Sequence, residues 1–535
     1  MPGSRDKSAF GLGVVVDRHR GLRIRWRERP LSSLHAMNDW NVDVTTRPNV
    51  LFILGESHAP DLLSVAGHPV IQTPNLDRLA QRGTVFKHAY CASPLCVPAR
   101  AAIATGLFPH ENGYWDSSMA YDGRHPSWMH QLRHVGYHTA GIGKMHFRSD
   151  DDDVGFSEII ETMQIADGIG DLVSALRHEG TEPSYQGLWD IWTSRYGAGD
   201  DSPYRQYDER IAAAAENWLE TAPKDAPWAL SVHFISAHAP FVTPQVFFDM
   251  YKPEDVQPPV QFGRQERTDH PSIVHLRRIV PHDADISLDQ VQALRAAYYA
   301  TVSYLDALIG RVLAALNASG QAENTLIVYT SDHGFSLGDH FIFGLFHMFE
   351  ESLKVPLILA GPGVPVGGQL EAAVSHVDLY PTLLEAAGLE ESGTQSTRMA
   401  KSLWPILSGS APDRGPVFSE YHGTATQTGG YVLRDGPMKL IHFVDMPPQL
   451  FDLVSDPEEG NNLANDSEHA DVLDRMMTLL HARVDPGAVN TAAKSAQSAL
   501  IAAHGGKAAV LQKMGGFSYT PPPGVRWQDM DGNQS

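Results

Sequence analysis

Two cysteines, five residues apart, are the side chains of this 535-residue sequence best suited to covalent chemistry. They lie in CASPLCVPARAAIATG, residues 91–106, where Pro98 and Arg100 follow Cys96. The composition of the residues after Cys96 predicts a helix. A helix N-terminus beside a guanidinium favours negative charge at the thiol. Cys96 is therefore predicted to be an activated nucleophile or part of an anion site. The alternative is a small buried apolar residue.

Cys91 is interpreted as a packed thiol, because the spacing is not the C-x-x-C of a redox pair. A bridge between two cysteines so close in sequence would stabilise little. Two cysteines cannot form a disulfide framework, and this favours a reducing compartment.

A second group of reactive side chains follows the ends of apolar runs. The group comprises Glu56, Ser57, His58, Lys144, His146, His238, Asp332 and His333. Taken singly, an Asp or His in such a place is often a helix cap, and Lys144 alone is more often a surface lysine. Open α/β sheets bind ligands beyond the carboxyl ends of their strands, so we expect these groups to converge in one crevice.

Glu56, Asp332 and His333 combine hard oxygen ligands with one imidazole nitrogen. Such a set suits one divalent cation, with calcium expected first and manganese or magnesium as alternatives. Zinc would favour more histidine or cysteine ligands.

The elements that must position these groups are buried strands alternating with helices. Continuous apolar runs predict the strands, at 49–55, 140–143, 228–235, 325–330 and 355–361. A helix is predicted over 73–83, with Thr73 as N-cap, Pro74 in its first turn and Gly83 past its end. A longer helix is predicted near 287–318. This alternation predicts the α/β class, with a doubly wound, mostly parallel sheet.

The pattern changes after about residue 405. GYVLRDGPMKLIHFV, residues 430–444, predicts a hairpin around the turn RDGP, and a helix is predicted near 467–484. We predict four regions: an extension without regular structure (1–46), an α/β catalytic domain (47–404), a smaller α+β domain with an antiparallel sheet (405–490) and a tail (491–535). The Gly- and Pro-rich tail is expected to cover a surface or a neighbouring subunit, in a homodimer or homotetramer.

The net charge of −22 disfavours nucleic acid or an anionic membrane as a partner. The sequence contains no run of about 18 apolar residues, which a membrane-spanning helix would need. The basic N-terminus contains only a short apolar stretch and makes a poor secretory signal. With the two cysteines, these features predict a cytoplasmic protein. An anionic substrate would need a locally positive site.

CVPAR, residues 96–100, resembles the C-x-P-S/A-R signature of type I sulfatases. Further blocks follow in family order, among them RPNVLFILGES, GKMHFR, YTSDHGFSLGDH, EESLKVPLILAGPG and QLFDLVSDPEEGNNL. The resemblance spans about residues 47 to 470. It implies an alkaline-phosphatase-like fold, in a family that also contains phosphonate monoester hydrolases and phosphodiesterases.

The resemblance also implies a chemistry. A maturation enzyme would oxidise Cys96 to formylglycine, whose hydrate on the metal would attack the ester. Arg100 would hold the loop and Lys144 the oxygens of the ester. His238 would protonate the leaving alcohol, and His146 would take the proton that allows the covalent ester to collapse. The implied metal ligands are Glu56, Ser57, Cys96, Asp332 and His333, and the implied substrate contacts are Lys144, His238, His347 and Ser117.

Four positions depart from the family pattern. Glu56 replaces an aspartate and Ser57 an acidic or amide ligand, for which His58 is a candidate substitute. Leu345 occupies the place of a substrate-binding lysine, and Ser117 that of an asparagine. One lost transition-state contact of this kind costs about 10²–10³ in rate. Either Phe343, Leu345 and Phe346 make the leaving-group side apolar, which suits a bulkier or aromatic ester, or the family constrains these positions loosely.

Three functions follow from the sequence. The first is hydrolysis of small sulfate esters by a formylglycine at position 96. The second is hydrolysis of phosphonate monoesters or phosphodiesters with the same residues. The third is binding of an anion without turnover, by a degraded member of the family.

Overall fold

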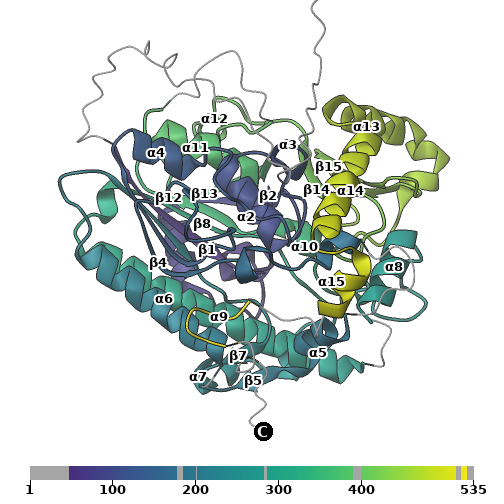
Figure 1. Cartoon of the computed structure of the whole chain (residues 1–535), viewed down its shortest axis with the longest axis horizontal. Helices are drawn as coiled ribbons and strands as arrows, with labels where there is room; N and C mark the ends of the chain where they lie inside the picture. Colours follow the sequence, from purple (N-terminus) through teal and green to yellow (C-terminus); the bar gives the residue numbers. More distant parts are fainter. Residues whose placement is uncertain are drawn as a thin grey trace, which may run out of the picture. The chain divides into compact units, whose positions relative to one another are not determined.

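A nine-stranded sheet forms the centre of the larger part of the chain (Figure 1). The structure is a computed structural model that describes residues 47–177, 185–200, 202–281, 286–389, 399–513, 520–526 and 530. The extension predicted for residues 1–46 lies outside the described residues.

The strands of this sheet are β1 (Asn49–Gly55), β2 (Gly83–Tyr90), β3 (His138–Lys144), β4 (Glu158–Met163), β6 (Trp228–His233), β8 (Thr325–Ser331), β11 (Lys354–Val355), β12 (Leu357–Ala360) and β13 (Gly368–Ser375). They lie in the order β11-β2-β12-β8-β1-β6-β3-β4, and β13 pairs with β2. Strands β8, β1, β6, β3 and β4 are parallel neighbours. Strand β12 runs antiparallel to both β8 and β2. The predicted α/β class with a mostly parallel sheet is confirmed.

Strand β1 explains why the core has two halves. All seven of its residues are buried. Val50, Phe52 and Leu54 belong to one apolar cluster, whereas Leu51 and Ile53 belong to another. Side chains alternate between the two faces of a strand, so this run is covered on both sides.

Helices α1 (Pro74–Gln81), α6 (Pro203–Glu220) and α9 (Leu288–Ala318) pack together on one face of the sheet. Helices α2 (Cys96–Thr105), α4 (Trp128–His134) and α11 (Leu379–Ala386) pack on the other (Figure 1). Among the described helices, α9 is long and apolar enough to cross a membrane, but 67% of its most apolar stretch is buried inside the fold. We interpret α9 as the core helix predicted near 287–318.

Shorter elements occupy the connections. They are α3 (Pro109–Asn112), α5 (Gln186–Ser194), β5 (Tyr196–Ala198), β7 (Phe241–Thr243), α7 (Gln245–Phe248), α8 (Pro271–Ile279), β9 (Ser336–Leu337), β10 (Phe343–Gly344), α10 (Glu350–Leu353) and α12 (Trp404–Leu407).

A second, four-stranded antiparallel sheet follows in the order β14 (Val417–Tyr421), β15 (Gly430–Asp435), β16 (Met438–Phe443) and β17 (Gln449–Asp452). Strands β15 and β16 form the predicted hairpin. Helix α13 (Ala470–Arg483) covers this sheet through Met476 and Leu480. Helices α14 (Pro486–Ala503) and α15 (Lys507–Lys513) come next, and α14 runs through the expected boundary at residue 490.

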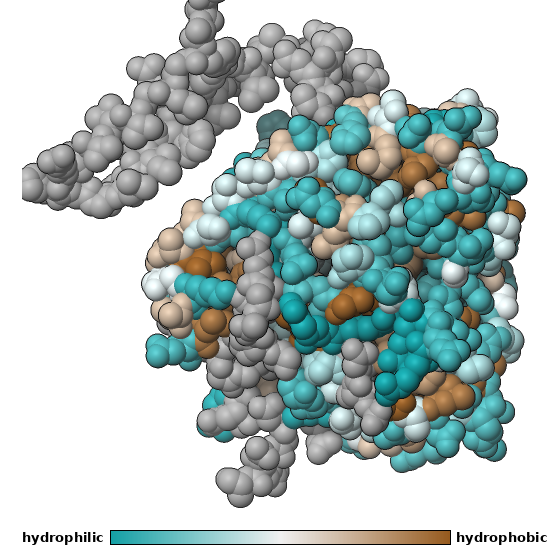
Figure 2. Space-filling model, turned by 90° about the vertical axis from the view of Figure 1, so that its right-hand side faces the viewer, coloured by the Kyte–Doolittle hydropathy of each residue, from teal (hydrophilic) through white to brown (hydrophobic). Residues whose placement is uncertain are grey.

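The described surface is mostly polar. Its exposed large apolar side chains are Val246, Val274, Leu288, Val366 and Val454. The face drawn in Figure 2 is mainly hydrophilic, with small scattered apolar areas.

Candidate functional site

The ends of four parallel strands meet at one edge of the large sheet. The register pairs Gly55 of β1 with Ser331 of β8, so Glu56 and Asp332 leave the sheet side by side. Strand β3 ends at Lys144, and the segment after β6 carries His238. The structure therefore brings the predicted strand-end groups together.

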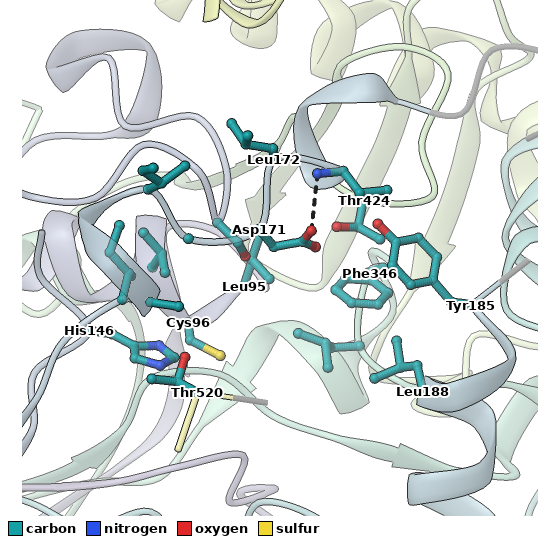
Figure 3. A pocket seen from close by; sticks show the side chains of 18 of the residues that line it. Leu95, Cys96, His146, Asp171, Leu172, Tyr185, Leu188, Phe346, Thr424 and Thr520 are labelled. Carbon is teal, nitrogen blue, oxygen red and sulfur yellow. Dashed lines mark hydrogen bonds between the residues drawn. The ribbon is translucent and has the colours of Figure 1, made fainter. Parts of the chain in front are cut away.

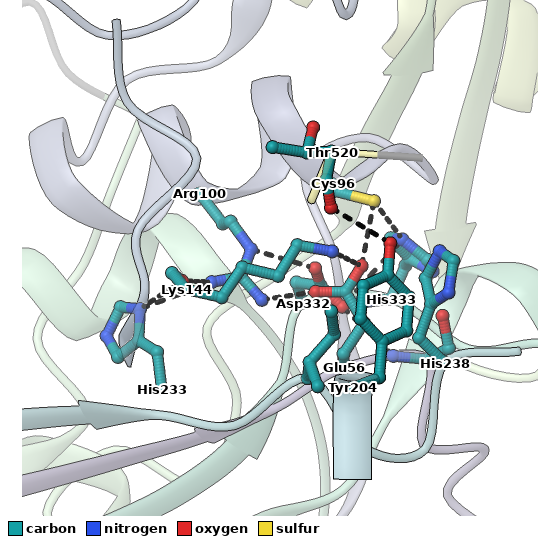
Figure 4. Close-up of polar contacts among 12 residues, drawn as sticks. Glu56, Cys96, Arg100, Lys144, Tyr204, His233, His238, Asp332, His333 and Thr520 are labelled. Atoms are coloured by element: carbon teal, nitrogen blue, oxygen red, sulfur yellow. Dashed lines mark hydrogen bonds and ion pairs between the residues drawn. The ribbon is translucent and has the colours of Figure 1, made fainter. Parts of the chain in front are cut away.

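Arg100 holds the two carboxylates of this edge (Figure 4). Helix α2 begins at Cys96, and Arg100 lies one turn further along it with 1% of its surface exposed. Its Nε donates to Asp332 Oδ2 at 3.0 Å, and its Nη2 donates to Glu56 Oε2. Its Nη1 donates to the backbone carbonyl of Lys144. One guanidinium thus joins three strand ends.

Four possible ligand atoms gather beside this guanidinium. They belong to Glu56, Cys96, Asp332 and His333, and all lie within 4.8 Å of one another. Cys96 Sγ lies 2.9 Å from Glu56 Oε1 and 3.3 Å from His333 Nε2. Two carboxylates and one imidazole fit a calcium, manganese or magnesium ion by their chemistry.

Two neighbouring residues, the predicted ligand Ser57 and the candidate substitute His58, follow Glu56 in the sequence. Ser57 donates its backbone N–H to Asp332 Oδ1 at 3.1 Å, and its buried hydroxyl has no hydrogen-bond partner. His58 contacts Tyr329 OH at 2.5 Å and the Leu62 carbonyl at 2.9 Å through its two ring nitrogens. Both nitrogens of His58 are therefore engaged, and it does not supplement the ligand set.

The charges of the site act on one another. Burial and the Glu56 carboxylate raise the pKa of the Cys96 thiol well above its usual value. Burial also acts to raise the pKa of Glu56, but attraction to Lys144 and Arg100 holds it well below its usual value. Burial and the nearby Glu56 raise the pKa of Asp332. Glu56 is therefore the firmly ionised carboxylate of the pair.

A cavity of about 450 Å³ opens in front of Cys96. Lys144, His146 and His238 line it, and Lys144 Nζ lies 2.7 Å from Glu56 Oε1. Both ring nitrogens of His146 are buried without a hydrogen-bond partner. His238 Nδ1 lies 2.5 Å from the Ala239 carbonyl, and burial together with Lys144 lowers the pKa of His238 to about 4. These imidazoles are neutral bases beside the reacting position.

Some of the other predicted substrate contacts line the cavity and others do not. Ser117 lines the cavity, as do Leu345 and Phe346. His347 does not line it: the side chain is fully buried, and its Nδ1 accepts the backbone N–H of Phe349 at 3.3 Å. Phe343 also lies away from the cavity and packs on Trp189, with ring centroids 5.1 Å apart.

Several lining residues were not predicted from the sequence. They are Asp171, Tyr185, Trp192, Tyr204, Thr424, His504, Val510 and Thr520. Figure 3 shows Cys96, His146 and Thr520 at one end of the cavity and Tyr185, Leu188 and Phe346 at the other. Thr424 follows β14, which the sequence did not predict as an apolar run, and the others do not follow a predicted strand, so the signal that located the strand-end groups does not apply to them.

Comparison with known proteins identifies the arrangement. Residues 48–389 match the family described as sulfatase, and residues 338–485 match the C-terminal region of N-sulphoglucosamine sulphohydrolase. This chain belongs to the sulfatase family. Sulfatases hydrolyse sulfate esters, so the crevice at Cys96 is the candidate active site of a sulfuric ester hydrolase.

Curated relatives agree with this assignment. This sulfatase is 32% identical over 440 residues to a choline-sulfatase of Rhizobium meliloti, covering 78% of this chain and 83% of the relative. It is also 32% identical over 464 residues to arylsulfatase K of Danio rerio, covering 82% and 84%.

Solved structures share the fold. A phosphonate monoester hydrolase of Agrobacterium radiobacter matches with a TM-score of 0.67 and 27% identity, over 82% of this chain and 96% of that one. A structure determined with its substrate D-glucosamine-2-N,6-O-disulfate matches with a TM-score of 0.65 and 26% identity, over 82% and 97%. The alkaline-phosphatase-like fold is thereby confirmed for this sulfatase.

Part of the cavity wall lies beyond the family match, which ends at residue 485. His504, Val510 and Thr520 all line the cavity. Tyr204 OH donates to the Thr520 carbonyl at 3.1 Å, and Arg210 Nη2 donates to the Pro523 carbonyl at 3.2 Å. Helix α6 thus holds the C-terminal segment of this sulfatase against its active site.

Proposed function

We propose that this sulfatase cleaves sulfate esters with a formylglycine nucleophile made from Cys96, in a crevice that holds one divalent cation. The observation that supports this most directly is the position of Cys96, within 2.9 Å of Glu56 and 3.3 Å of His333 at the end of the cavity. The raised pKa of the Cys96 thiol leaves little thiolate at neutral pH. An oxidised side chain with an oxygen nucleophile suits the position better.

Glu56, Asp332 and His333 would hold the cation, with calcium first and manganese or magnesium as alternatives. The bound cation would supply positive charge to the sulfate oxygens and lower the pKa of an oxygen nucleophile. Arg100 fixes the two carboxylates in place through its contacts at Asp332 Oδ2 and Glu56 Oε2. The Lys144 ammonium is positioned to bind a sulfate oxygen, where it would stabilise charge that develops in the transition state.

Two histidines would move the protons. His238 Nδ1 donates to the Ala239 carbonyl, so Nε2 is the atom that would carry the second proton of an imidazolium ring. A bound sulfate ester is an anion and would favour that charged form, from which Nε2 would deliver its proton to the leaving oxygen. His146 lines the same cavity with both ring nitrogens unpartnered, and it would accept the proton released when the product leaves. Burial, and to a smaller extent the positive charge of Lys144, lower the pKa of His146 well below its usual value. The ring is therefore neutral and able to accept a proton.

The maturation enzyme, the cytoplasmic location and a homodimer or homotetramer belong to the same proposal. Both cysteines are free and buried. This agrees with a reducing compartment.

The deciding experiment combines mass spectrometry with turnover. Protein made in a host that has the maturation system should yield a peptide spanning residues 88–100 about 18 Da lighter than its cysteine form. The same protein should hydrolyse 4-nitrophenyl sulfate, and Cys96→Ala should abolish turnover. Unmodified but active protein would refute the formylglycine. Modified protein that turns over no sulfate ester would refute the proposed reaction.

A second candidate, hydrolysis of phosphonate monoesters, is supported by the similarity to the Agrobacterium radiobacter phosphonate monoester hydrolase. Matched 4-nitrophenyl sulfate and 4-nitrophenyl phenylphosphonate separate the two. We expect the larger kcat/KM for the sulfate, and the reverse order would make the phosphonate activity primary. If Cys96→Ala and wild type bind sulfate equally and neither turns over an ester, the chain is the degraded anion-binding form.

A further inference from the structure

The charges that line the cavity are divided unequally between its two ends. Among the described lining residues, Lys144 is the single lysine or arginine, and it belongs to the reacting end. The carboxylates are Asp167, which is exposed, and Asp171, which is half-buried. A leaving group that reaches past Lys144 therefore meets negative charge.

Asp171 is held in place by its own loop. Its backbone N–H donates to the Ser117 carbonyl at 3.3 Å, and one carboxylate oxygen accepts the Val173 N–H at 3.0 Å. Figure 3 shows the Tyr185 hydroxyl on the same side of the cavity as the Asp171 carboxyl group, with Thr424 between them. Burial raises the pKa of Asp171 to about 6, so the group carries negative charge at neutral pH.

Aromatic rings line the same cavity as this carboxylate, and Figure 3 shows Phe346 and Tyr185 near Asp171. Tyr185, Trp192 and Phe346 all line the cavity and are almost fully buried. The rings of Trp192 and Phe346 lie 5.9 Å apart, with an angle of 42° between their planes. The face of an aromatic ring attracts a cation by about 0.5–2 kcal/mol. A carboxylate beside several rings is therefore a better environment for an ammonium group than for a hydroxyl or a second sulfate.

The size of the space restricts the leaving group. The cavity holds about 450 Å³, near the lower end of the range for small-molecule sites. Val510 and Thr520, from beyond the family match, help to enclose it. A small alcohol fits this space better than a chain of sulfated sugars.

From this distribution we infer that the substrates are sulfate esters of small alcohols that carry an ammonium group. The sulfate lies at Cys96 and Lys144, and the ammonium lies between Asp171 and the rings of Tyr185, Trp192 and Phe346. The carboxylate repels a leaving group that carries a second sulfate or a carboxylate. This inference rests on the proposed sulfatase reaction and deepens it.

The test compares esters of one shape and different charge. The cationic ester is 2-(trimethylammonio)ethyl sulfate, the neutral isostere is 3,3-dimethylbutyl sulfate, and the anionic ester is 3-carboxypropyl sulfate. We expect kcat/KM to be about 10–30-fold higher for the cationic than for the neutral ester, and lowest for the anionic ester. Hydrolysis of 4-nitrophenyl sulfate is measured alongside, since it reports the proposed reaction without an ammonium group.

A matched pair of variants assigns the preference to Asp171. Asp171→Asn keeps the side-chain oxygen that accepts the Val173 N–H, and it should lower the cationic-to-neutral ratio by about tenfold. Asp151→Asn removes the same charge from an exposed position that does not line the cavity, and its ratio should match wild type. The ratio is insensitive to a partial loss of folded protein, because both esters are measured on the same sample.

Equal kcat/KM values for the cationic and neutral esters would overturn the inference, as would an Asp171→Asn ratio equal to wild type. Failure to hydrolyse any of the esters, 4-nitrophenyl sulfate included, would instead overturn the proposed reaction. In that case binding still tests the ammonium site in the Cys96→Ala protein. Choline should then bind at least about tenfold more tightly than 3,3-dimethylbutan-1-ol, and equal affinities would refute the site.

Discussion

Arg100 sets the geometry of the reacting end, because one side chain contacts both carboxylates and the carbonyl of Lys144. Buried ion pairs of this kind add little net stability, since removing the charges from water offsets their attraction. Removing one partner is different, because an uncompensated charge is then left in the interior. The cluster is therefore best understood as a device that keeps two carboxylates close together.

Arg100→Lys tests this at the residue scale. A lysine keeps the charge but cannot donate in the three directions that the guanidinium uses. We expect the affinity for calcium to fall at least about tenfold and the free energy of unfolding to fall by about 3 kcal/mol. Calorimetric titration with calcium and urea unfolding measure the two effects.

Arg148→Lys is the matched control, because Arg148 is 46% exposed and pairs with Asp152 at the surface. It should leave both quantities unchanged. An Arg100→Lys protein with normal calcium affinity would show that the carboxylates hold their positions without the guanidinium.

His238→Gln tests the proposed proton donor. A leaving group that is already a good anion gains little from protonation, whereas an alkoxide gains much. We expect kcat/KM to fall by about 10²–10⁴ for an alkyl sulfate and by less than about tenfold for 4-nitrophenyl sulfate. A series of aryl sulfates with increasing phenol pKa measures the trend. Equal losses across the series would give His238 a role in binding instead.

At the scale of elements, the strand ends define the site and helix α6 supports it from behind. Asp208 on α6 is fully buried, and its carboxylate accepts the backbone N–H groups of Ile235 and Ser236 at 2.8 and 3.0 Å. These residues lead directly from β6 to His238. The helix therefore fixes the segment that carries the proposed proton donor.

Asp208 predicts a dependence of stability on pH. Burial raises the pKa of Asp208 to about 7 from an ordinary value of 3.8, so the folded state retains a proton that the unfolded chain releases. The resulting stabilisation is full below about pH 4 and is lost as the pH rises toward 7. Asp208→Asn removes this contribution, so the fall in unfolding free energy from pH 5 to pH 8 should be smaller in the variant. Urea unfolding at both pH values measures it, and an unchanged fall would contradict the assignment.

The sequence predicts the parallel core well, because residues such as Leu51, Phe52 and Ile53 form continuous runs that only a strand covered on both faces accommodates. It does not predict β2, in which Lys87 is exposed and pairs with Glu371 of β13 at 2.6 Å. It also does not predict the antiparallel direction of β12, since direction depends on the path of the connecting chain.

Some residues of the candidate site can be predicted from the sequence and others cannot. Glu56 and Asp332 are predictable because the register of parallel strands brings consecutive ends to one edge. Asp171 and Tyr185 are not, because they come from a loop and the start of α5, and only tertiary packing brings them to the cavity. The prediction for His347 relied on its spacing along the loop. The backbone of this loop is irregular, since the neighbouring Phe346 has a positive φ of 80°.

At the scale of the whole molecule, a net charge of −22 surrounds a site for an anion. The face drawn in Figure 2 is mainly hydrophilic. A strongly negative protein repels an approaching anion, and salt screens this repulsion because the Debye length shortens from about 30 Å at 0.01 M to about 10 Å at 0.1 M.

Ionic strength should therefore affect the two kinds of ester differently. We expect kcat/KM for the singly negative 4-nitrophenyl sulfate to rise several-fold as KCl increases from about 10 to about 100 mM. The zwitterionic 2-(trimethylammonio)ethyl sulfate has no net charge and should respond less. A fall in kcat/KM for 4-nitrophenyl sulfate would show that the local field of Lys144 and a bound cation outweighs the field of the whole protein.

The contact between α6 and Thr520 can form only late in the synthesis of the chain. Thr520 lies against the active site, yet it leaves the ribosome ~400 residues after Cys96, which takes about 20–80 s at ordinary rates of translation. If Cys96 is converted to formylglycine as proposed, a modifying enzyme could reach the CVPAR stretch during that interval, before Thr520 takes its place in the cavity wall. The contact of Thr520 with Tyr204 would then cover a side chain that had already been oxidised.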